Sequence, residues 1–323
     1  MGKTNLAINQ LLERKPIFAD FINGTVFQGE QFLHPDDLEL LSAQYGVFYD
    51  DETGKTHTLE RYGDIRMKAE TGTYSIVFAN ETQAKVHYAM PVRNMLYDAL
   101  EYMKQVKNLE KEHKEAGDTL DSAAFLSGIT KEDRLTPVIN TVFYTGTDWD
   151  GKKSLYEMMD LEEDSPLAQI WKEYLPNYKI NIICADEIED PQVFQSSLQQ
   201  IFTMLKYRNR KKELYRYVND HKEDLKRMDN VELTAALTLI GEQKRLLKII
   251  REQKKEESEV CKAIDDLIED GREEGRKEGE SKGQERINEL NRRLLADNRH
   301  ADLVKSVEDS AYQKTLLQEY GLV

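Results

Sequence analysis

Two carboxylates and one amide within residues 64–83 have the types and spacing that metal-assisted hydrolysis requires. Asp64 and Glu81 stand far enough apart for a two-stranded hairpin to bring them to one end of a sheet. Gln83 shares a strand face with Glu81, because side chains alternate along a strand. Carboxylates beside an amide are typical of Mg²⁺ sites, which take hard oxygen ligands and retain water. The alternative is that both acids face solvent, as most carboxylates do.

The pattern of apolar residues indicates the elements that would position these groups. Residues 59–83 contain two strand-like runs around the turn at residues 71–73, which predicts two paired strands. Residues 89–115 have apolar side chains at helical spacing with Pro91 near the start, which predicts an amphipathic helix. The hairpin would bring Asp64 and Glu81 to the same end of the sheet, and the helix follows it directly along the chain.

Further elements are predicted on both sides of the hairpin. They are a helix over residues 5–21 interrupted at Pro16, a short helix over residues 35–41, buried strands at residues 137–144 and 180–185, and helices from residue 191 onward. This order predicts an α/β fold with a central mixed sheet flanked by helices and a charged C-terminal helical extension.

Composition and charge limit the class of protein. The 323 residues include 45 Lys and Arg against 60 Asp and Glu, a net charge of −15, which excludes a small basic nucleic-acid binder. The hydrophobic fraction of 39% predicts one compact domain with solvated helices beyond it. No segment has the features of a signal peptide or a membrane span. We therefore expect a cytoplasmic protein with no membrane contact.

Other chemistries find no support in the sequence. Cys184 and Cys261 lie in unlike settings, and we expect both to be reduced thiols. The six histidines lack the spacing of zinc ligands. Residues 146–153 come close to a phosphate-binding loop, but Lys153 stands where Ser or Thr must reach the metal, and the segment carries two aspartates. We expect an ordinary loop there and no nucleotide cofactor.

One concentrated basic segment is interleaved with tyrosines. Its cations are Lys206, Arg208, Arg210, Lys211 and Lys212. Such a run is a candidate phosphate-binding patch for DNA, and the alternative is a solvated helix face.

Four glycines at intervals of four residues mark the C-terminal region. They are Gly271, Gly275, Gly279 and Gly283. Each costs a helix about 0.5–1 kcal/mol, so we expect either a partner helix along that side or a frayed, flexible connector.

Several dispersed segments resemble one known family. They are FADFINGTVFQGEQFLHPDDLELL, ERYGDIRMK, FANETQAKVHYAMPVRNMLYDALEY and PVINTVFYTGTDWDG, followed by the glycine-spaced tail. Together they resemble the Rpn family of recombination-promoting nucleases, also grouped as PD-(D/E)XK nuclease family transposases. The likeness covers about the first two hundred residues. It implies a restriction-endonuclease-like PD-(D/E)XK core that cleaves DNA phosphodiesters with Mg²⁺, which Mn²⁺ is able to replace.

The resemblance assigns roles to individual residues. Asp64, Glu81 and Gln83 would be catalytic, and Asp64, Glu81 and the main-chain carbonyl of Thr82 would hold the metal. Gln83 takes the position that holds Lys in the general nuclease motif. A neutral amide hydrogen-bonds but does not neutralise charge, so we expect slow turnover or a cation borrowed from elsewhere, with Lys68 and Lys85 as candidates.

Accessory roles fall to residues on the two flanking helices. Asp20 and Asn23 would add a ligand or water contact, the alternative being a helix-end cap. Arg93 and Tyr97 share a helix face and would meet the scissile phosphate, the alternative being a salt bridge and a tyrosine at the core edge.

The resemblance thus implies a metal-dependent DNA endonuclease linked to recombination, mobile elements or defence. We expect a nuclease-like domain at residues 1–205, a charged helical region at 206–270, and a glycine-spaced connector with C-terminal helices at 271–323 through which copies of the chain associate. The rival hypothesis, kept open by Gln83, is a catalytically inactive nuclease fold that acts as a DNA-binding or oligomeric scaffold.

Overall fold

A computed structural model describes residues 3–42, 44–50, 56–62, 64–72, 74–117, 121–159, 166–241 and 258–322. The chain forms two compact units, Met1–Asn209 with Arg227–Lys254, and Arg210–Lys226 with Lys255–Val323. The first stretch of the first unit ends at Asn209, slightly beyond the predicted boundary at residue 205. The unit also includes the later segment Arg227–Lys254. No pattern in the sequence indicated that this later segment belongs to the first unit.

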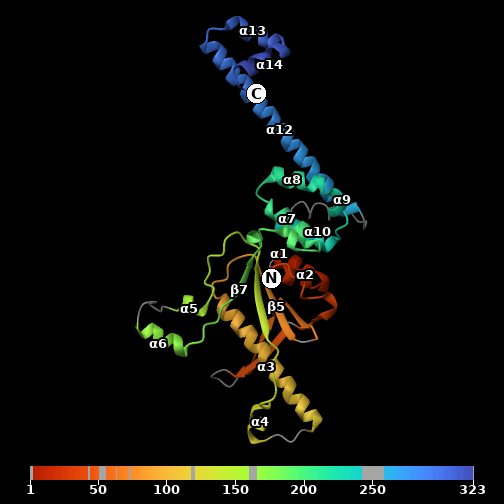
Figure 1. Ribbon diagram of the computed structural model, residues 1–323, viewed down its shortest axis with the longest axis vertical. Helices are drawn as coiled ribbons and strands as arrows, with labels where there is room; N and C mark the ends of the chain where they lie inside the picture. The colour runs from red at the N-terminus through yellow and green to blue at the C-terminus, as the bar shows by residue number, and fades with distance from the viewer. Residues whose placement is uncertain are drawn as a thin grey trace. The chain divides into compact units, whose positions relative to one another are not determined.

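The first unit is built on a mixed sheet of five strands in the order β1-β4-β5-β6-β7. The pairs β1–β4 and β4–β5 are antiparallel, whereas β5–β6 and β6–β7 are parallel. Helices lie on both faces of this sheet (Figure 1), which confirms the predicted α/β class. The strands are β1 (Leu38–Leu40), β4 (Ile65–Glu70), β5 (Ser75–Gln83), β6 (Val138–Tyr144) and β7 (Asn181–Cys184).

The predicted hairpin is present, but it begins later than expected. Strands β4 and β5 pair from Ile65 opposite Asn80 to Glu70 opposite Ser75. The turn between them includes Gly72 with φ +70°, a left-handed conformation that favours glycine. The preceding residues belong instead to β3 (Thr56–Tyr62), which pairs with β2 (Gln44–Asp50) in a separate two-stranded sheet.

The short helix predicted over residues 35–41 is wrong beyond its first turn. A single 3₁₀ turn, η1 (Pro35–Asp37), is followed directly by edge strand β1. Leu38 is buried and Leu40 is 50% exposed, so only the start of this edge strand reaches the core. Pairing with β4 satisfies the backbone of this segment, so tertiary contact overrides the local helix signals.

Helices on the two faces use opposite sets of strand side chains. On one face, Phe143 of β6 packs edge-on against Phe21, with ring centroids 5.1 Å apart, and lies 6.0 Å from the ring of Phe202. Phe21 belongs to α2 (Lys15–Thr25) and Phe202 to α7 (Leu198–Lys206). On the other face, α3 (Met90–Ala116) packs on β6 through Met90 and Val142. The sheet therefore presents one largely aromatic face and one face to α3.

The remaining elements of the first unit complete these layers. Helix α1 contacts both β5 and α10. No helix among the described residues combines the length and apolarity needed to cross a bilayer. The further bounds are α1 (Lys3–Leu12), α4 (Ser122–Ser127), α5 (Leu155–Met158), α6 (Pro166–Tyr174), η2 (Ala185–Glu187), η3 (Pro191–Val193) and α10 (Asn230–Leu239).

The second unit is helical and contains the glycine-spaced segment. The segment lies inside one continuous helix, α12, so the expectation of a frayed connector is wrong. Ion pairs at helical spacing, such as Arg276–Glu280 and Lys277–Glu273, each offset about 0.3–0.5 kcal/mol of the glycine cost. The helices of this unit are α8 (Lys211–Asp220), α9 (Lys222–Leu225), α12 (Ser258–Ala296), α13 (His300–Glu308) and α14 (Ser310–Glu319).

Candidate active site

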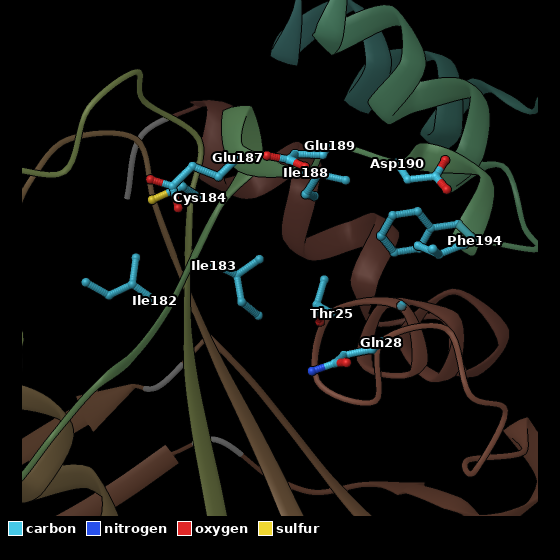
Figure 2. Close-up of a pocket in the computed structure, with 12 residues that line it drawn as sticks. Thr25, Gln28, Ile182, Ile183, Cys184, Glu187, Ile188, Glu189, Asp190 and Phe194 are labelled. Carbon is cyan, nitrogen blue, oxygen red and sulfur yellow. The ribbon is translucent and has the colours of Figure 1, made fainter.

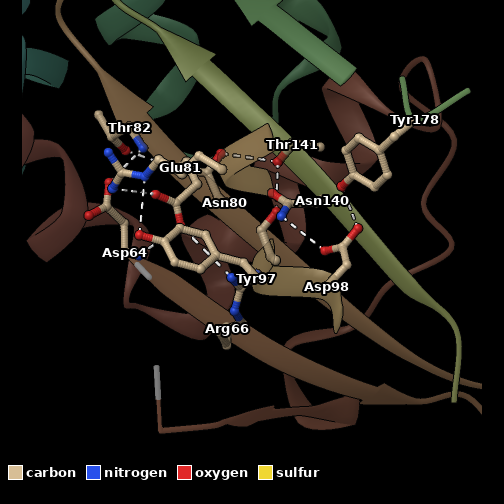
Figure 3. Close-up of polar contacts among 12 residues, drawn as sticks. Asp64, Arg66, Asn80, Glu81, Thr82, Tyr97, Asp98, Asn140, Thr141 and Tyr178 are labelled. Atoms are coloured by element: carbon tan, nitrogen blue, oxygen red, sulfur yellow. Dashed lines mark hydrogen bonds and ion pairs between the residues drawn. The ribbon is translucent and has the colours of Figure 1, made fainter. Parts of the chain in front are cut away.

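Asp64 and Glu81 meet at the open end of the β4–β5 hairpin. Asp64 lies just before β4, where its Oδ2 accepts a hydrogen bond of 2.7 Å from the main-chain N–H of Thr82. The main-chain N–H of Asp64 donates in turn to Oε1 of Glu81 over 3.2 Å. Figure 3 shows the two acids side by side beneath Thr82. These reciprocal bonds hold both carboxylates at one end of the sheet.

Two arginines flank Glu81 on the face covered by α3. Nη2 of Arg93 lies 3.2 Å from Oε2 of Glu81, and Nη2 of Arg66 lies 3.8 Å from Oε1. Both guanidinium groups lie over the ring of Tyr97, at 5.4 and 5.6 Å. Nε of Arg93 also donates to the hydroxyl of Tyr97 over 3.1 Å. The predicted Arg93–Tyr97 pair therefore lies beside Glu81.

Arg66 is the cation that sequence reasoning missed. It pairs in register with Ala79 of β5, which puts it on the same sheet face as Glu81, and it is fully buried. Lys68, which was singled out instead, forms an ion pair with the exposed Glu70. The available signal was strand alternation, because Arg66 stands between Asp64 and Lys68 with the same parity.

The surroundings of Asp64 and Glu81 disfavour the ionised form of both carboxyl groups. Burial, reinforced by the charge of Asp64, raises the pKa of Glu81 to about 7, although Arg66 and Arg93 oppose the shift. Burial also raises the pKa of Asp64, against the hydrogen bond from Thr82. Two guanidinium groups thus only partly stabilise the charged forms. Perturbed acids grouped in this way are typical of functional sites.

Helix α1 contributes two amide side chains to the same place. Nδ2 of Asn5 donates a hydrogen bond of 2.7 Å to the main-chain carbonyl of Thr82. Asn9, one helical turn later, hydrogen-bonds the carboxylate of Asp64, which lowers the pKa of that group against the effect of burial. Both residues escaped the sequence analysis, because their partners are far away along the chain.

The polar character of the α3 face continues beyond Glu81. Asp98 accepts hydrogen bonds from the hydroxyl of Tyr178 over 2.5 Å and from Nδ2 of Asn140 over 3.1 Å, as Figure 3 shows. Burial raises the pKa of Asp98. With Glu101, which is also buried, this face carries four carboxyl groups, namely Asp64, Glu81, Asp98 and Glu101, beside the guanidinium groups of Arg66 and Arg93.

Other predicted site residues are placed elsewhere or differently engaged. Asp20 accepts hydrogen bonds from the backbone of Gln195 and Ser196 and holds the loop before α7. Asn23 bonds both backbone groups of Leu33. Neither side chain caps the end of a helix, which was the structural alternative; both instead tie α2 to a loop.

Gln83 and Lys85 lie at and just beyond the end of β5. The side chain of Gln83 is half-buried, and its main-chain carbonyl accepts from the N–H of Thr145 over 2.8 Å. Lys85 is exposed. Gln83 follows Glu81 on the same side of the strand, as predicted from alternation.

The basic segment crosses the boundary between the two units. In the first unit, Lys206 donates to the carbonyl of Glu189, and Arg208 pairs with Asp186. In the second unit, Lys212 pairs with Glu278. Arg210 and Lys211 lie at the start of the second unit, outside these three contacts. Acidic groups and a carbonyl therefore engage several of the predicted DNA contacts.

A separate pocket of about 530 Å³ lies beside β7, and none of the predicted site residues lines it. Figure 2 shows Ile182 and Ile183 on one wall and Thr25 with Gln28 on the other. Cys184 also lines it, and burial raises the pKa of this thiol to about 11. The thiol therefore stays protonated at neutral pH and is not an activated nucleophile.

Comparisons with known proteins add no further assignment. A scan of family models, a search of curated proteins and a search of solved structures each return no match. Within the described ranges, no three His, Cys, Asp or Glu side chains form a cluster that could hold a metal ion. Near Asp64, the described structure therefore brings together two carboxylates, the main-chain carbonyl of Thr82 and the side-chain amides of Asn5 and Asn9.

Proposed function

We propose that the chain is a Mg²⁺-dependent DNA endonuclease with a PD-(D/E)XK core. The observation that carries the proposal is the pair of reciprocal hydrogen bonds that holds Asp64 and Glu81 at one end of the hairpin. The charge of the half-buried Asp64 disfavours ionisation of the fully buried Glu81, and such electrostatically unfavourable pairs are concentrated at functional sites.

The donor set suits a hard divalent cation. Asp64, Glu81 and the carbonyl of Thr82 would hold the ion, because all three offer the oxygen ligands that Mg²⁺ prefers. The raised pKa values of both acids indicate that the local positive charge is insufficient to stabilise their ionised forms. A bound Mg²⁺ or Mn²⁺ would lower the pKa of a water molecule and neutralise charge on a phosphate.

The surrounding residues divide the remaining tasks. Gln83 lies on the side of β5 that carries Glu81 and would orient the attacking water by hydrogen bonding. Arg93 would exchange Glu81 for a phosphate oxygen of the substrate, with Tyr97 guiding its guanidinium. Arg66 stays buried beneath Glu81 and supplies fixed positive charge in place of the motif lysine.

The substrate class follows from the family resemblance and is limited by charge. A net charge of −15 opposes tight non-specific binding, which depends on many Lys and Arg contacts with phosphates. We propose weak or regulated engagement of DNA in recombination, mobile-element transfer or defence, in the cytoplasm, by an oligomer assembled through the C-terminal helices.

Plasmid cleavage tests the nuclease proposal. Supercoiled plasmid is incubated with wild type, Asp64→Asn or Glu81→Gln, in Mg²⁺, in Mn²⁺ and in EDTA. Glu70→Gln is the matched control, because Glu70 is an exposed acid on the same hairpin. We expect metal-dependent nicking or linearisation by wild type and by the control, and at least a hundredfold slower cleavage by the two site variants.

The alternative function is a catalytically inactive scaffold that binds DNA. It is favoured by Gln83 in the place of the motif lysine and by the engagement of Glu81 with Arg93. If wild type shifts DNA on a gel while all variants and wild type leave the plasmid intact, the scaffold replaces the nuclease as the conclusion.

A further inference from the structure

Asn5 and Asn9 bring helix α1 into direct contact with two of the proposed metal ligands. Asn5 donates to the Thr82 carbonyl over 2.7 Å, and Asn9 hydrogen-bonds the Asp64 carboxylate. The two asparagines are four residues apart, so they lie on one face of the helix. Two neighbouring polar groups on one helix thus engage one site.

Buried apolar side chains on and beside the asparagine face anchor α1 and hold these amides in place. Ile8, Leu11 and Leu12 are buried, and the helix contacts α10 as well as β5. At its end, Arg14 pairs with Asp229 over 2.5 Å. Burial of such side chains stabilises a helix position by about 1.5–3 kcal/mol each. Helix α1 is therefore a fixed wall of the site.

The Asn5 amide is oriented with its nitrogen, not its oxygen, toward the proposed site. Nδ2 of Asn5 donates a hydrogen bond to the Thr82 carbonyl, which is one of the proposed metal ligands. Oδ1 of Asn5 is buried without a hydrogen-bond partner in the described part of the chain. A buried amide oxygen left in this way costs free energy. Amide N–H groups repel a cation, whereas amide oxygens are good ligands for Mg²⁺ and Ca²⁺.

We propose that Asn5 is a further residue of the metal site, which holds the Thr82 carbonyl in the metal-free protein and turns its amide oxygen to a bound divalent cation. Asn9 is a positioning residue that orients Asp64. This inference rests on the proposed metal-dependent function. It adds a ligand from α1 to a site otherwise built by the hairpin.

Calorimetric titration of the full-length protein with Mn²⁺ tests the inference without relying on cleavage. The variants are Asn5→Leu, which removes both polar atoms, and Asn5→Asp, which keeps an oxygen and removes the donor. Gln10→Leu, on an exposed position of the same helix, is the matched control. Circular dichroism checks that every variant is folded.

We expect Asn5→Leu to weaken Mn²⁺ binding about tenfold. This is the low end of the loss of metal affinity that follows removal of a residue supporting the ligands of a metal site. Asn5→Asp should bind Mn²⁺ at least as tightly as wild type, because it retains an oxygen and adds negative charge. Asn9→Leu should also weaken binding, by less. Equal affinities for wild type, Asn5→Leu and Asn5→Asp would overturn the inference. The hydrogen bond from Asn5 to the Thr82 carbonyl would then have only a structural role.

Glu81→Gln separates this inference from the proposed function. If wild type binds Mn²⁺ and Glu81→Gln does not, the metal site stands, and the Asn5 variants alone decide the inference. If wild type binds no Mn²⁺, or if Glu81→Gln binds it equally well, the proposed site and the role of Asn5 both fail.

Discussion

Arg66 and Glu81 face each other across neighbouring strands, with Nη2 of the arginine 3.8 Å from Oε1 of the glutamate and both side chains fully buried. A buried ion pair contributes little net stability, because desolvation of both groups offsets their attraction. Removal of Arg66 is different, since it leaves the fully buried Glu81 with only the partly exposed Arg93 to compensate its charge. The pair therefore couples the stability of the sheet to the chemistry of the site.

We predict that Arg66→Met lowers the free energy of unfolding by about 3–5 kcal/mol, the cost of breaking a buried pair. The double variant Arg66→Met/Glu81→Gln should recover most of that loss, because the buried charge of Glu81 is removed as well and Arg93 is partly exposed to solvent. Urea denaturation at pH 7.5 measures both, and the two single variants complete a double-mutant cycle. Additive effects of the two substitutions would contradict the coupling.

The pH dependence of stability should report the environment of Glu81. Its pKa is about 7 in the folded protein, above the ordinary value of 4.5, so the folded chain holds a proton that the unfolded chain releases first. Stability therefore falls as the pH rises from about 4.5 to 7 and levels off above 7, with a loss of about 3 kcal/mol. Below pH 4.5 this contribution is constant.

Chemical denaturation of wild type and Glu81→Gln between pH 4.5 and 8 measures the contribution of Glu81 to the free energy of unfolding. The difference between the two proteins is used, because titrations common to both cancel in it. We expect wild type to lose stability relative to Glu81→Gln as the pH rises through this window. A stability difference that is constant with pH would show that Glu81 ionises normally. Added Mg²⁺ should reduce the loss in wild type, because a cation favours the ionised carboxylate.

The glycines of α12 offer a prediction for the second unit. An added Cβ at Gly275, Gly279 or Gly283 meets no atom of the described chain within 4 Å, whereas one at Gly271 would lie 2.5 Å from Cγ of Tyr215. Alanine at each of the first three positions should stabilise the helix by about 0.5–1 kcal/mol. Alanine at Gly271 should destabilise the packing of α8 on α12.

Thermal unfolding followed by circular dichroism at 222 nm compares these four variants. Sedimentation of the triple alanine variant then tests the proposed association through the C-terminal helices. If the side of α12 that carries these three glycines packs against another copy of the chain, the added methyl groups should disrupt that contact. The triple variant should then dissociate into single chains. Stabilisation of the triple variant with an unchanged oligomeric state would place the self-association surface elsewhere.

Local patterns predicted the parts of the fold that depend on neighbours in the chain. Strands β6 and β7 and helix α3 follow from apolar periodicity and Pro91, and the glutamate-to-glutamine spacing placed Gln83 on the side of Glu81. Edge strand β1 was missed, because its residues adopt a strand only through pairing with β4. For the glycine-spaced segment, the sequence left open a helix with a partner or a frayed connector, because the ion pairs along its surface were left out of account.

The sequence by itself determined most of the central elements and singled out Asp64, Glu81, Arg93 and Tyr97, whose types and short-range spacing limit where they can point. Only the tertiary structure decided that Arg66 lies beneath Glu81 and that Asn5 reaches the carbonyl of Thr82. It also decided that Asp20 and Asn23 hold loops, by engaging their side chains with distant backbone. The physical reason is that hydrogen bonds and ion pairs between segments far apart in sequence depend on register and packing, which side-chain periodicity does not encode.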